Sequence, residues 1–255
     1  MKRRKFIQSS VAASAVPLSA TAMGTGRFNE TAAGKELYEI RTYELRFGGN
    51  QKLLTDYLKN ALHPALSRTG ANHFMLFGEI SSTLPKKIRA IISYPNMESY
   101  LKGQNLADDT EYDKAASDYN ALPVDKPIFN RFSSSLLLAF DGIPKMVDPV
   151  DGATIFELRT YEGYSEDAVR RKIKMFNDDE LPLFYEVGLN PIFFGDMIAG
   201  PYRPCLTYML NYKDMDAHAA AWKNFLNAPA WNQMKVKEEY ANTVSNIRNV
   251  FLELI

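Results

Sequence analysis

Two copies of a charged and aromatic triplet stand out in this 255-residue sequence as side chains that could do chemistry. In each copy a glutamate, an arginine and a tyrosine occupy every second position. Because alternate residues of a β-strand point to the same face, each triplet would present its carboxylate, guanidinium and phenol together. The arginine could bind an acidic or carbonyl group, and the tyrosine could donate a hydrogen bond. The candidate ligand-binding residues are Glu39, Arg41, Tyr43, Glu157, Arg159 and Tyr161.

The same triplets also have a purely structural interpretation. A buried charge must be paired or neutralised, and glutamate and arginine two residues apart on one face can pair with each other. Two such pairs could form a salt-bridge ladder that fixes how the strands pair. The duplication favours this structural role, since an active site is rarely needed twice in one chain. Both interpretations stay open, and the sequence names no catalytic residue.

Other side chains with chemical potential are few. His218, in a predicted helix, and His63 are the candidates for a haem ligand. No second histidine lies three or four residues from His218, so we expect no metal site. The single cysteine, Cys205, excludes an intramolecular disulfide and a cysteine-cluster zinc site, and we expect a buried core thiol. Phosphate-binding glycine loops and the GxSxG and HExxH motifs are absent from the sequence.

The elements that would position these residues occur twice, because the chain contains an internal repeat. Residues 38–44 (YEIRTYE) recur as residues 156–162 (FELRTYE), at an offset of 118. Pro64 and Pro182 match at the same offset. Collinear matches at one offset indicate the duplication of a domain of about 110 residues.

Each copy predicts the element order β-α-β-β-α-β, so the fold class is α+β with tandem ferredoxin-like units. Helical spacing predicts helices over residues 50–68 and 165–187, which Pro64 and Pro182 should bend or end. Asn96 and Asp214 suit the N-cap positions of second helices. The predicted strands span residues 37–46, 72–80, 86–94, 128–140, 154–162, 191–198, 204–212 and 244–254.

The faces of the first strands follow from residue parity. The helices of a ferredoxin-like unit cover one sheet face, and the open faces of two units would close into a barrel. The mostly apolar set Tyr38, Ile40 and Thr42 would lie under the helices. The two triplets would then point the other way, into the interface between the sheets.

A tryptophan-rich segment follows in the second copy. Residues 221–231 (AWKNFLNAPAW) predict two helical pieces broken at Pro229. Trp222 and Trp231 would close a core or the mouth of a cavity. An exposed hydrophobic contact site is the alternative.

The first 22 residues have the features of a cleaved export signal, with a basic start, a weakly apolar stretch and small residues Ala20 and Ala22 at a cleavage pattern. Arg3 and Arg4, followed by Phe6, resemble the twin-arginine signal, which implies export of a folded protein to the periplasm. The predicted domains are a signal peptide at 1–22, a loose leader at 23–36, a first repeat at 37–140, a linker at 141–153 and a second repeat at 154–255.

Charge and hydropathy exclude several classes of function. The chain has 30 basic and 30 acidic residues, and removal of the signal takes four basic residues, which leaves 26 against 30 and a net charge of −4. Without a basic excess we expect no nucleic-acid partner. No apolar run reaches the roughly 18 residues of a membrane-spanning helix. The chain ends in VFLELI, a poorly protected strand edge, so we expect a homodimer.

The openings at residues 39–44 and 157–162, together with residues 221–231, resemble the NIPSNAP family. The resemblance covers roughly residues 37–255 and is stronger in the second copy. The first copy departs from the family in lacking both tryptophans and in an acidic stretch around Asp108 and Asp109. The resemblance implies the dimeric α+β barrel superfamily, which includes small monooxygenases and haem-handling enzymes, but it implies no catalytic residues.

Three functional hypotheses follow. The first is an exported barrel that binds a small ligand or a partner, without a cofactor. The second is a cofactor-independent monooxygenase or isomerase that acts on a small aromatic or carbonyl compound. The third is a haem-binding protein that uses His218 or His63. A lone histidine or aspartate in the cavity beside the arginine and tyrosine would favour the second hypothesis.

Overall fold

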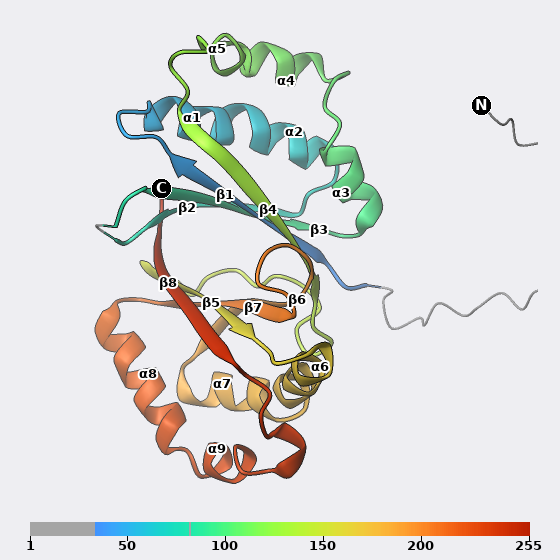
Figure 1. The fold of residues 1–255 in the computed structure, drawn as a ribbon, viewed down its shortest axis with the longest axis vertical. Coiled ribbons are helices and arrows are strands. Elements are labelled where there is room, and N and C mark those ends of the chain that lie inside the picture. Colours follow the sequence, from blue (N-terminus) through green and yellow to red (C-terminus); the bar gives the residue numbers. More distant parts are fainter. Residues whose placement is uncertain (1–33, 82) are drawn as a thin grey trace, which may run out of the picture. The chain divides into compact units, whose positions relative to one another are not determined.

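The structure is a computed structural model that describes residues 34–81 and 83–255. The predicted export signal, with Arg3, Arg4, Phe6, Ala20 and Ala22, lies outside the described residues. Strands and helices alternate as expected in both repeats (Figure 1). The strands are β1 (Leu37–Leu45), β2 (His73–Glu79), β3 (Lys87–Tyr94) and β4 (Phe129–Ala139), then β5 (Ile155–Glu162), β6 (Asn190–Ala199), β7 (Cys205–Tyr212) and β8 (Asn246–Leu254).

The helices begin where the sequence places polar caps. The side chains of Asn50, Asn96, Ser165 and Asp214 each accept a hydrogen bond from the backbone amide three residues further on. The first repeat contains α1 (Gln51–Tyr57), η2 (Leu58–Leu62), α2 (His63–Arg68), α3 (Met97–Gly103), α4 (Thr110–Ala115) and α5 (Ser117–Asn120). The second repeat contains α6 (Glu166–Met175), η3 (Phe176–Glu180), α7 (Leu181–Val187), α8 (Met215–Asn227), α9 (Pro229–Met234) and η4 (Glu238–Tyr240).

A π-helical turn precedes the proline in the long helix of each repeat. Pro64 follows η2, and Pro182 follows η3, at the same offset of 118 residues. Proline donates no helical hydrogen bond and crowds the preceding turn, and the wider π turn accommodates it. The helix therefore continues through each proline, so the expectation that it could end there is wrong.

The strands of both repeats form one closed barrel in the order β1-β3-β2-β8-β5-β7-β6-β4. The repeats join at two antiparallel pairs, β2 with β8 and β4 with β6. Strand β8 also pairs along β5. The C-terminal strand is thus paired on both sides within the chain and is not a free edge.

The barrel interior is apolar and contains side chains from both repeats. Tyr38 packs on Phe193, with ring centroids 4.9 Å apart, and Phe77 packs on Phe156 at 5.0 Å. Ile40 and Leu158 belong to the same buried cluster. Separate clusters lie between the sheet and the helices of each repeat.

This arrangement corrects the predicted faces of β1 and β5. Tyr38 and Ile40 point into the barrel, whereas Tyr43 packs with the helix leucines Leu54 and Leu58. The alternation was assigned correctly, but its direction was wrong. Both faces of the sheet are buried here. The apolar residues of each strand therefore fill the barrel interior, and the residues of the two triplets lie under the helices.

The predicted linker, residues 141–153, is fixed to both repeats. Met146 is buried, and its amide donates to Glu36 Oε2 at 2.8 Å. The amide of Val150 donates to Asn211 Oδ1 at 2.9 Å. The described residues, 34–81 and 83–255, accordingly belong to one compact unit. Among the described residues, no helix combines the length and apolar character needed to cross a membrane.

Candidate ligand-binding site in the second repeat

A cavity of about 460 Å³ lies between the sheet and the helices of the second repeat. Strands β5 and β8 contribute side chains from one side, and α6, η3, α7, α8 and α9 contribute them from the other. Its lining includes Glu157, Arg159 and Tyr161, the second predicted triplet. The triplet therefore does line a cavity, but on the helix side of the sheet.

Glu157 is the centre of a hydrogen-bond network at the base of this cavity. Its side chain is 1% exposed. Trp222 Nε1 donates to Oε2 at 3.1 Å, and Tyr212 OH donates to the same oxygen at 3.4 Å. Arg159 Nη1 donates to Oε1 at 2.5 Å, and Asn249 Nδ2 donates to it at 3.4 Å. The charge of this carboxylate is therefore compensated by donors on strands β5, β7 and β8 and on helix α8.

The Arg159 guanidinium makes cation–π contacts with two aromatic rings. Its central carbon is 4.5 Å from the centroid of the Trp222 ring and 5.6 Å from that of Tyr161. Burial works against the charged form, but Tyr208, Tyr161 and Glu157 outweigh it and raise the pKa of Arg159. Its Nε is buried and has no hydrogen-bond partner within the protein. A buried donor without an acceptor costs about 1–3 kcal/mol. The other two nitrogens hold the guanidinium in place, since Nη1 donates to Glu157 and Nη2 donates to the Tyr161 hydroxyl at 3.4 Å.

His218 on α8 places an imidazole beside the same carboxylate. Its Nε2 lies 3.3 Å from Glu157 Oε2, within ion-pair range but without hydrogen-bond geometry. The ring also packs edge-on against Tyr212 and Phe251, at centroid distances of 4.9 and 5.1 Å. The imidazole is thus held in place by aromatic packing, beside the Glu157 carboxylate.

A buried ion pair forms another part of the lining. Lys172 Nζ on α6 contacts Glu180 Oε1 at the end of η3, and the two residues are 5% and 2% exposed. The ammonium lies 4.4 Å from the Phe176 ring centroid and 5.9 Å from that of Trp231. Desolvation by burial raises the pKa of the Glu180 carboxyl.

The aromatic walls come from the tryptophan-rich segment. Helix α8 ends at Asn227 and α9 begins at Pro229, which confirms the predicted break. The turn between them brings Trp231 to 4.6 Å from the Phe225 ring, and Phe225 packs against Trp222 at 5.6 Å. Both tryptophans line the cavity, as predicted for residues at its mouth.

The first triplet is enclosed by protein side chains. Glu39 accepts hydrogen bonds from Arg41 Nε at 2.8 Å, Tyr94 OH at 3.0 Å and Ser134 Oγ at 2.6 Å. Arg41 Nη2 donates to Gln104 Oε1 at 3.4 Å. Burial, opposed by the positive charge of Arg41, raises the pKa of Tyr43 to about 12. Its ring lies 5.0 Å from that of Phe132. Glu39, Arg41 and Tyr43 therefore form a structural cluster.

Sequence reasoning missed Lys172 and Glu180 as residues of the site. A direct comparison of the repeats could have found them, since the residues 118 positions earlier are Leu54 and Leu62. An ionic pair that replaces two leucines in a duplicated helix is a signal for a specialised site. The sequence indicates His218 only as a haem ligand, and it does not reveal that His218 lies beside Glu157, because the two residues are 61 positions apart.

A second hollow, of about 600 Å³, opens at one end of the barrel interior. Hydroxyl groups from both repeats line it, including Ser133 and Ser135, and Thr160 and Thr207 hydrogen-bond at 2.8 Å. Its charged Arg89 is paired with Glu79. The barrel is therefore filled only in part, but this hollow lacks the aromatic walls of the second-repeat cavity.

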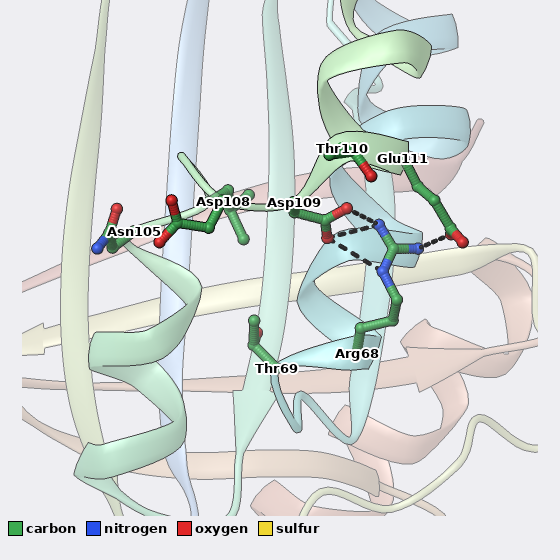
Figure 2. Close-up of a pocket in the computed structure, with 8 residues that line it drawn as sticks. Arg68, Thr69, Asn105, Asp108, Asp109, Thr110 and Glu111 are labelled. Carbon is green, nitrogen blue, oxygen red and sulfur yellow. Dashed lines mark hydrogen bonds and ion pairs between the residues drawn. The ribbon is translucent and has the colours of Figure 1, made fainter.

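The acidic stretch of the first repeat surrounds Arg68 in a shallow surface depression (Figure 2). Arg68 donates three hydrogen bonds to the Asp109 carboxylate, at 2.6, 2.8 and 3.0 Å, and pairs with Glu111 at 3.1 Å. Asp109 also caps α4 by accepting from the amide of Tyr112. These ion pairs connect α4 to α2, so the two carboxylates have a structural role.

The described residues contain no group of three histidine, cysteine, aspartate or glutamate side chains arranged to hold a metal ion. Cys205 is buried, as expected, and burial raises the pKa of its thiol to about 11. His63 is exposed on the protein surface and stacks on Phe74.

Comparison with solved structures gives two matches over most of the chain and shorter matches over part of it. A putative monooxygenase from Lactobacillus acidophilus is 11% identical, with a TM-score of 0.56, over 86% of this chain and 94% of that one. A putative monooxygenase from Fusobacterium nucleatum is 9% identical, with a TM-score of 0.58, over 87% and 93%. A NIPSNAP-like domain protein from Burkholderia xenovorans is 19% identical over 40% of this chain and 84% of its own, with a TM-score of 0.36.

The fold shared with the two monooxygenase-like structures is the α+β barrel predicted from the sequence. A comparison with curated proteins gave no match. The NIPSNAP family model matches residues 156–255, the part of the chain that contains the cavity. By this match, the second repeat is similar to the NIPSNAP family.

Proposed function

We propose that the second-repeat cavity binds a small aromatic compound that carries a hydrogen-bonding oxygen. The observation that carries this proposal is the combination of aromatic walls with a polar floor. Trp222, Phe225 and Trp231 offer ring faces and edges, and Arg159, whose side chain is 14% exposed, brings a guanidinium to the cavity lining. Sites for small molecules are mostly apolar, with a few polar groups that fix the ligand's orientation.

The charge balance of the cavity favours a neutral ligand. Glu157 is paired with Arg159, and Glu180 is paired with Lys172. Each cation already has a carboxylate partner, so an anionic ligand would have to displace it. A phenol, an aromatic ketone or an aromatic aldehyde needs only a hydrogen bond.

Intrinsic fluorescence gives a direct test, because the chain contains two tryptophans and both line the cavity. A titration with phenol, acetophenone and benzoate should quench tryptophan emission with saturation, more tightly for the neutral compounds than for benzoate. Native mass spectrometry of freshly purified protein would identify any ligand that is retained. Unchanged emission with every aromatic probe would contradict the proposal.

A matched pair of variants locates the binding site. Arg159→Met removes the donor but keeps the aliphatic stem, so the affinity for acetophenone should fall about tenfold or more, as expected when a hydrogen bond from a charged group is lost. Arg68→Met, at the surface depression of Figure 2, is the control and should bind normally.

A second candidate function is oxygenation of a bound aromatic compound without a cofactor. The specific observation is His218 beside Glu157 at the cavity floor, where the imidazole could accept a phenolic proton. The fold is that of two putative monooxygenases. Oxygen consumption in the presence of a bound phenol, lost in His218→Phe but kept in Tyr100→Phe at the corresponding place in the first repeat, would support this function. If the protein binds the phenol but consumes no oxygen, the oxygenase function is wrong and the ligand-binding function stands.

We also propose that the chain is exported by the twin-arginine route. Arg3 and Arg4 before a weakly apolar stretch support this proposal. The mature protein should begin near Met23 and should remain in the cytoplasm when Arg3 and Arg4 are both replaced by lysine. Normal export of that double variant would contradict the route.

The homodimer is a further proposal. The unpaired edge that suggested it is used within the chain, so its support now comes from apolar side chains at the surface. Phe47 and Val124 are 98% and 99% exposed, and covering such side chains is favourable. Sedimentation equilibrium at micromolar concentration should give twice the chain mass, and a single species of one chain mass would contradict the dimer.

A further inference from the structure

We propose that Lys172 is a nucleophile that forms a reversible Schiff base with an aldehyde or ketone in the second-repeat cavity, and that Glu180 moves the required proton. This inference rests on the proposed function, because the carbonyl compound belongs to the class of ligands assigned to that cavity. It adds a covalent step, a residue that performs it and a narrower class of substrate.

The first observation is the position of the ion pair. Lys172 lies four residues before η3, and Glu180 is the last residue of η3. The first repeat has Leu54 and Leu62 at the corresponding positions, both buried. The same helix, with the same π turn, therefore folds with leucines in one repeat and with a lysine and a glutamate in the other.

The second observation concerns energetics. Removing two charges from water costs several kcal/mol per ion, and well-packed apolar residues at such positions are often equally or more stabilising. The first repeat shows that leucines fit this helix. The ion pair is thus not required for the helix to form, and a buried amine beside a cavity indicates chemistry.

The third observation is the surroundings of the amine. Lys172 and Glu180 both line the cavity, as do Trp231 and Tyr161. Lys172 Nζ is 5.9 Å from the Trp231 ring centroid and 5.8 Å from that of Tyr161. An aromatic carbonyl compound held against these rings would place its carbonyl carbon near the amine.

The proposed step is balanced without an oxidant or a reductant. The Lys172 ammonium gives a proton to Glu180, whose burial makes it a better proton acceptor because its pKa is raised. The free Nζ lone pair attacks the carbonyl carbon and forms a carbinolamine. Glu180 returns the proton to the carbinolamine oxygen, which leaves as water, and a protonated imine remains. The overall change is one C=N bond formed, one C=O bond broken and one water released.

Reductive trapping tests this step on the full-length protein. Benzaldehyde with cyanoborohydride should attach one benzyl group to Lys172, located by peptide mapping. The trapping should be about tenfold or more faster than at any exposed lysine, because the amine and its proton acceptor are prepositioned. Lys174 lies on the same helix and is half exposed, so Lys174→Arg is the matched control and should label normally. Lys172→Arg should lose the fast label.

A second pair of variants addresses folding and the role of Glu180. Glu180→Gln should slow trapping about tenfold, and its stability is checked by urea unfolding. The double variant Lys172→Leu with Glu180→Leu copies the first repeat, so it should fold while losing the label completely. Its tryptophan emission should still be quenched by phenol.

The outcomes separate this inference from the proposed function. If benzaldehyde quenches tryptophan emission but Lys172 is labelled no faster than exposed lysines, the covalent step is wrong and the binding function stands. If benzaldehyde and phenol neither quench nor label, both are wrong. Fast labelling of the Glu180→Gln variant would remove Glu180 from the step and require another proton acceptor.

Discussion

The two repeats contain the same glutamate–arginine pair on the same face of the sheet, yet they surround it differently. In the first repeat, Ser134 and Tyr94 donate to Glu39, and Gln104 accepts from Arg41. In the second repeat, Trp222 and His218 stand 118 residues after Gln104 and Tyr100. Their large rings belong to a longer helix, α8, and border a cavity.

The helix that faces the pair therefore decides what the pair can do. Helix α3 ends at Gly103, so Gln104 forms its C-cap and reaches the arginine directly. Helix α8 continues to Asn227, and its Phe225 packs against Trp231 of α9, so aromatic rings from both helices line the cavity. The first repeat thus encloses its ion pair, and the second repeat places its ion pair at a cavity. The following variants test this difference, beginning with the largest expected effect.

Arg41→Ala should lower the free energy of unfolding by about 3–5 kcal/mol. The substitution leaves Glu39, which is 1% exposed, as a buried carboxylate without its counter-ion. Urea unfolding measures the change, and ligand binding in the other repeat should not change. A loss of less than about 1 kcal/mol would mean that the pair is solvated and the first repeat is not a closed cluster.

Arg159→Ala should cost less stability, about 1–3 kcal/mol, and should weaken ligand binding. Trp222 and Asn249 still donate to Glu157 after the substitution, and the cavity admits water to the remaining carboxylate. Unfolding and tryptophan-quenching measurements on the same protein give both quantities. Equal stability losses at Arg41 and Arg159, with binding unaffected, would show that the two pairs have the same role.

The double variant Lys172→Leu with Glu180→Leu should be as stable as the natural protein, or more stable by up to about 4 kcal/mol. It makes the second repeat like the first, where Leu54 and Leu62 pack in the helix-side core. The single variant Lys172→Leu is the control and should be the less stable of the two, because Glu180 loses its partner. A large loss of unfolding free energy in the double variant would show that the ion pair stabilises the fold.

The smallest effect is a pH dependence of stability. Burial raises the pKa of Glu180 above its ordinary value of 4.5, so the folded protein holds this proton to a higher pH than the unfolded chain does. The stability gained from the bound proton is complete at acid pH and is lost as the pH rises through the folded-state pKa. The double leucine variant should therefore gain stability relative to the natural protein between about pH 4.5 and neutral pH. Urea unfolding across this range measures the difference, and a constant difference would contradict it.

Much of the fold followed from local patterns. The strand positions, the caps at Asn96 and Asp214 and the break at Pro229 agree with the structure within one or two residues. These features depend on side-chain periodicity and on backbone preferences that act over a few residues. The site was predicted only in part, because Glu157 and Arg159 were named for the wrong side of the sheet.

The sequence by itself determined the repeat, the order of the elements and the shared face of each triplet, since all three depend on spacing along the chain. Only the tertiary structure decided which face of β1 and β5 points into the barrel. Both faces are buried, so neither is marked as the solvent-facing side, and the alternation alone does not say which one faces the helices. It also decided that β8 pairs with β2 of the other repeat and is no free edge. Finally, it brought Lys172, Glu180 and Trp231 around one cavity with Glu157. Contacts between residues so far apart in the chain depend on how the helices pack on the sheet, which no local pattern specifies.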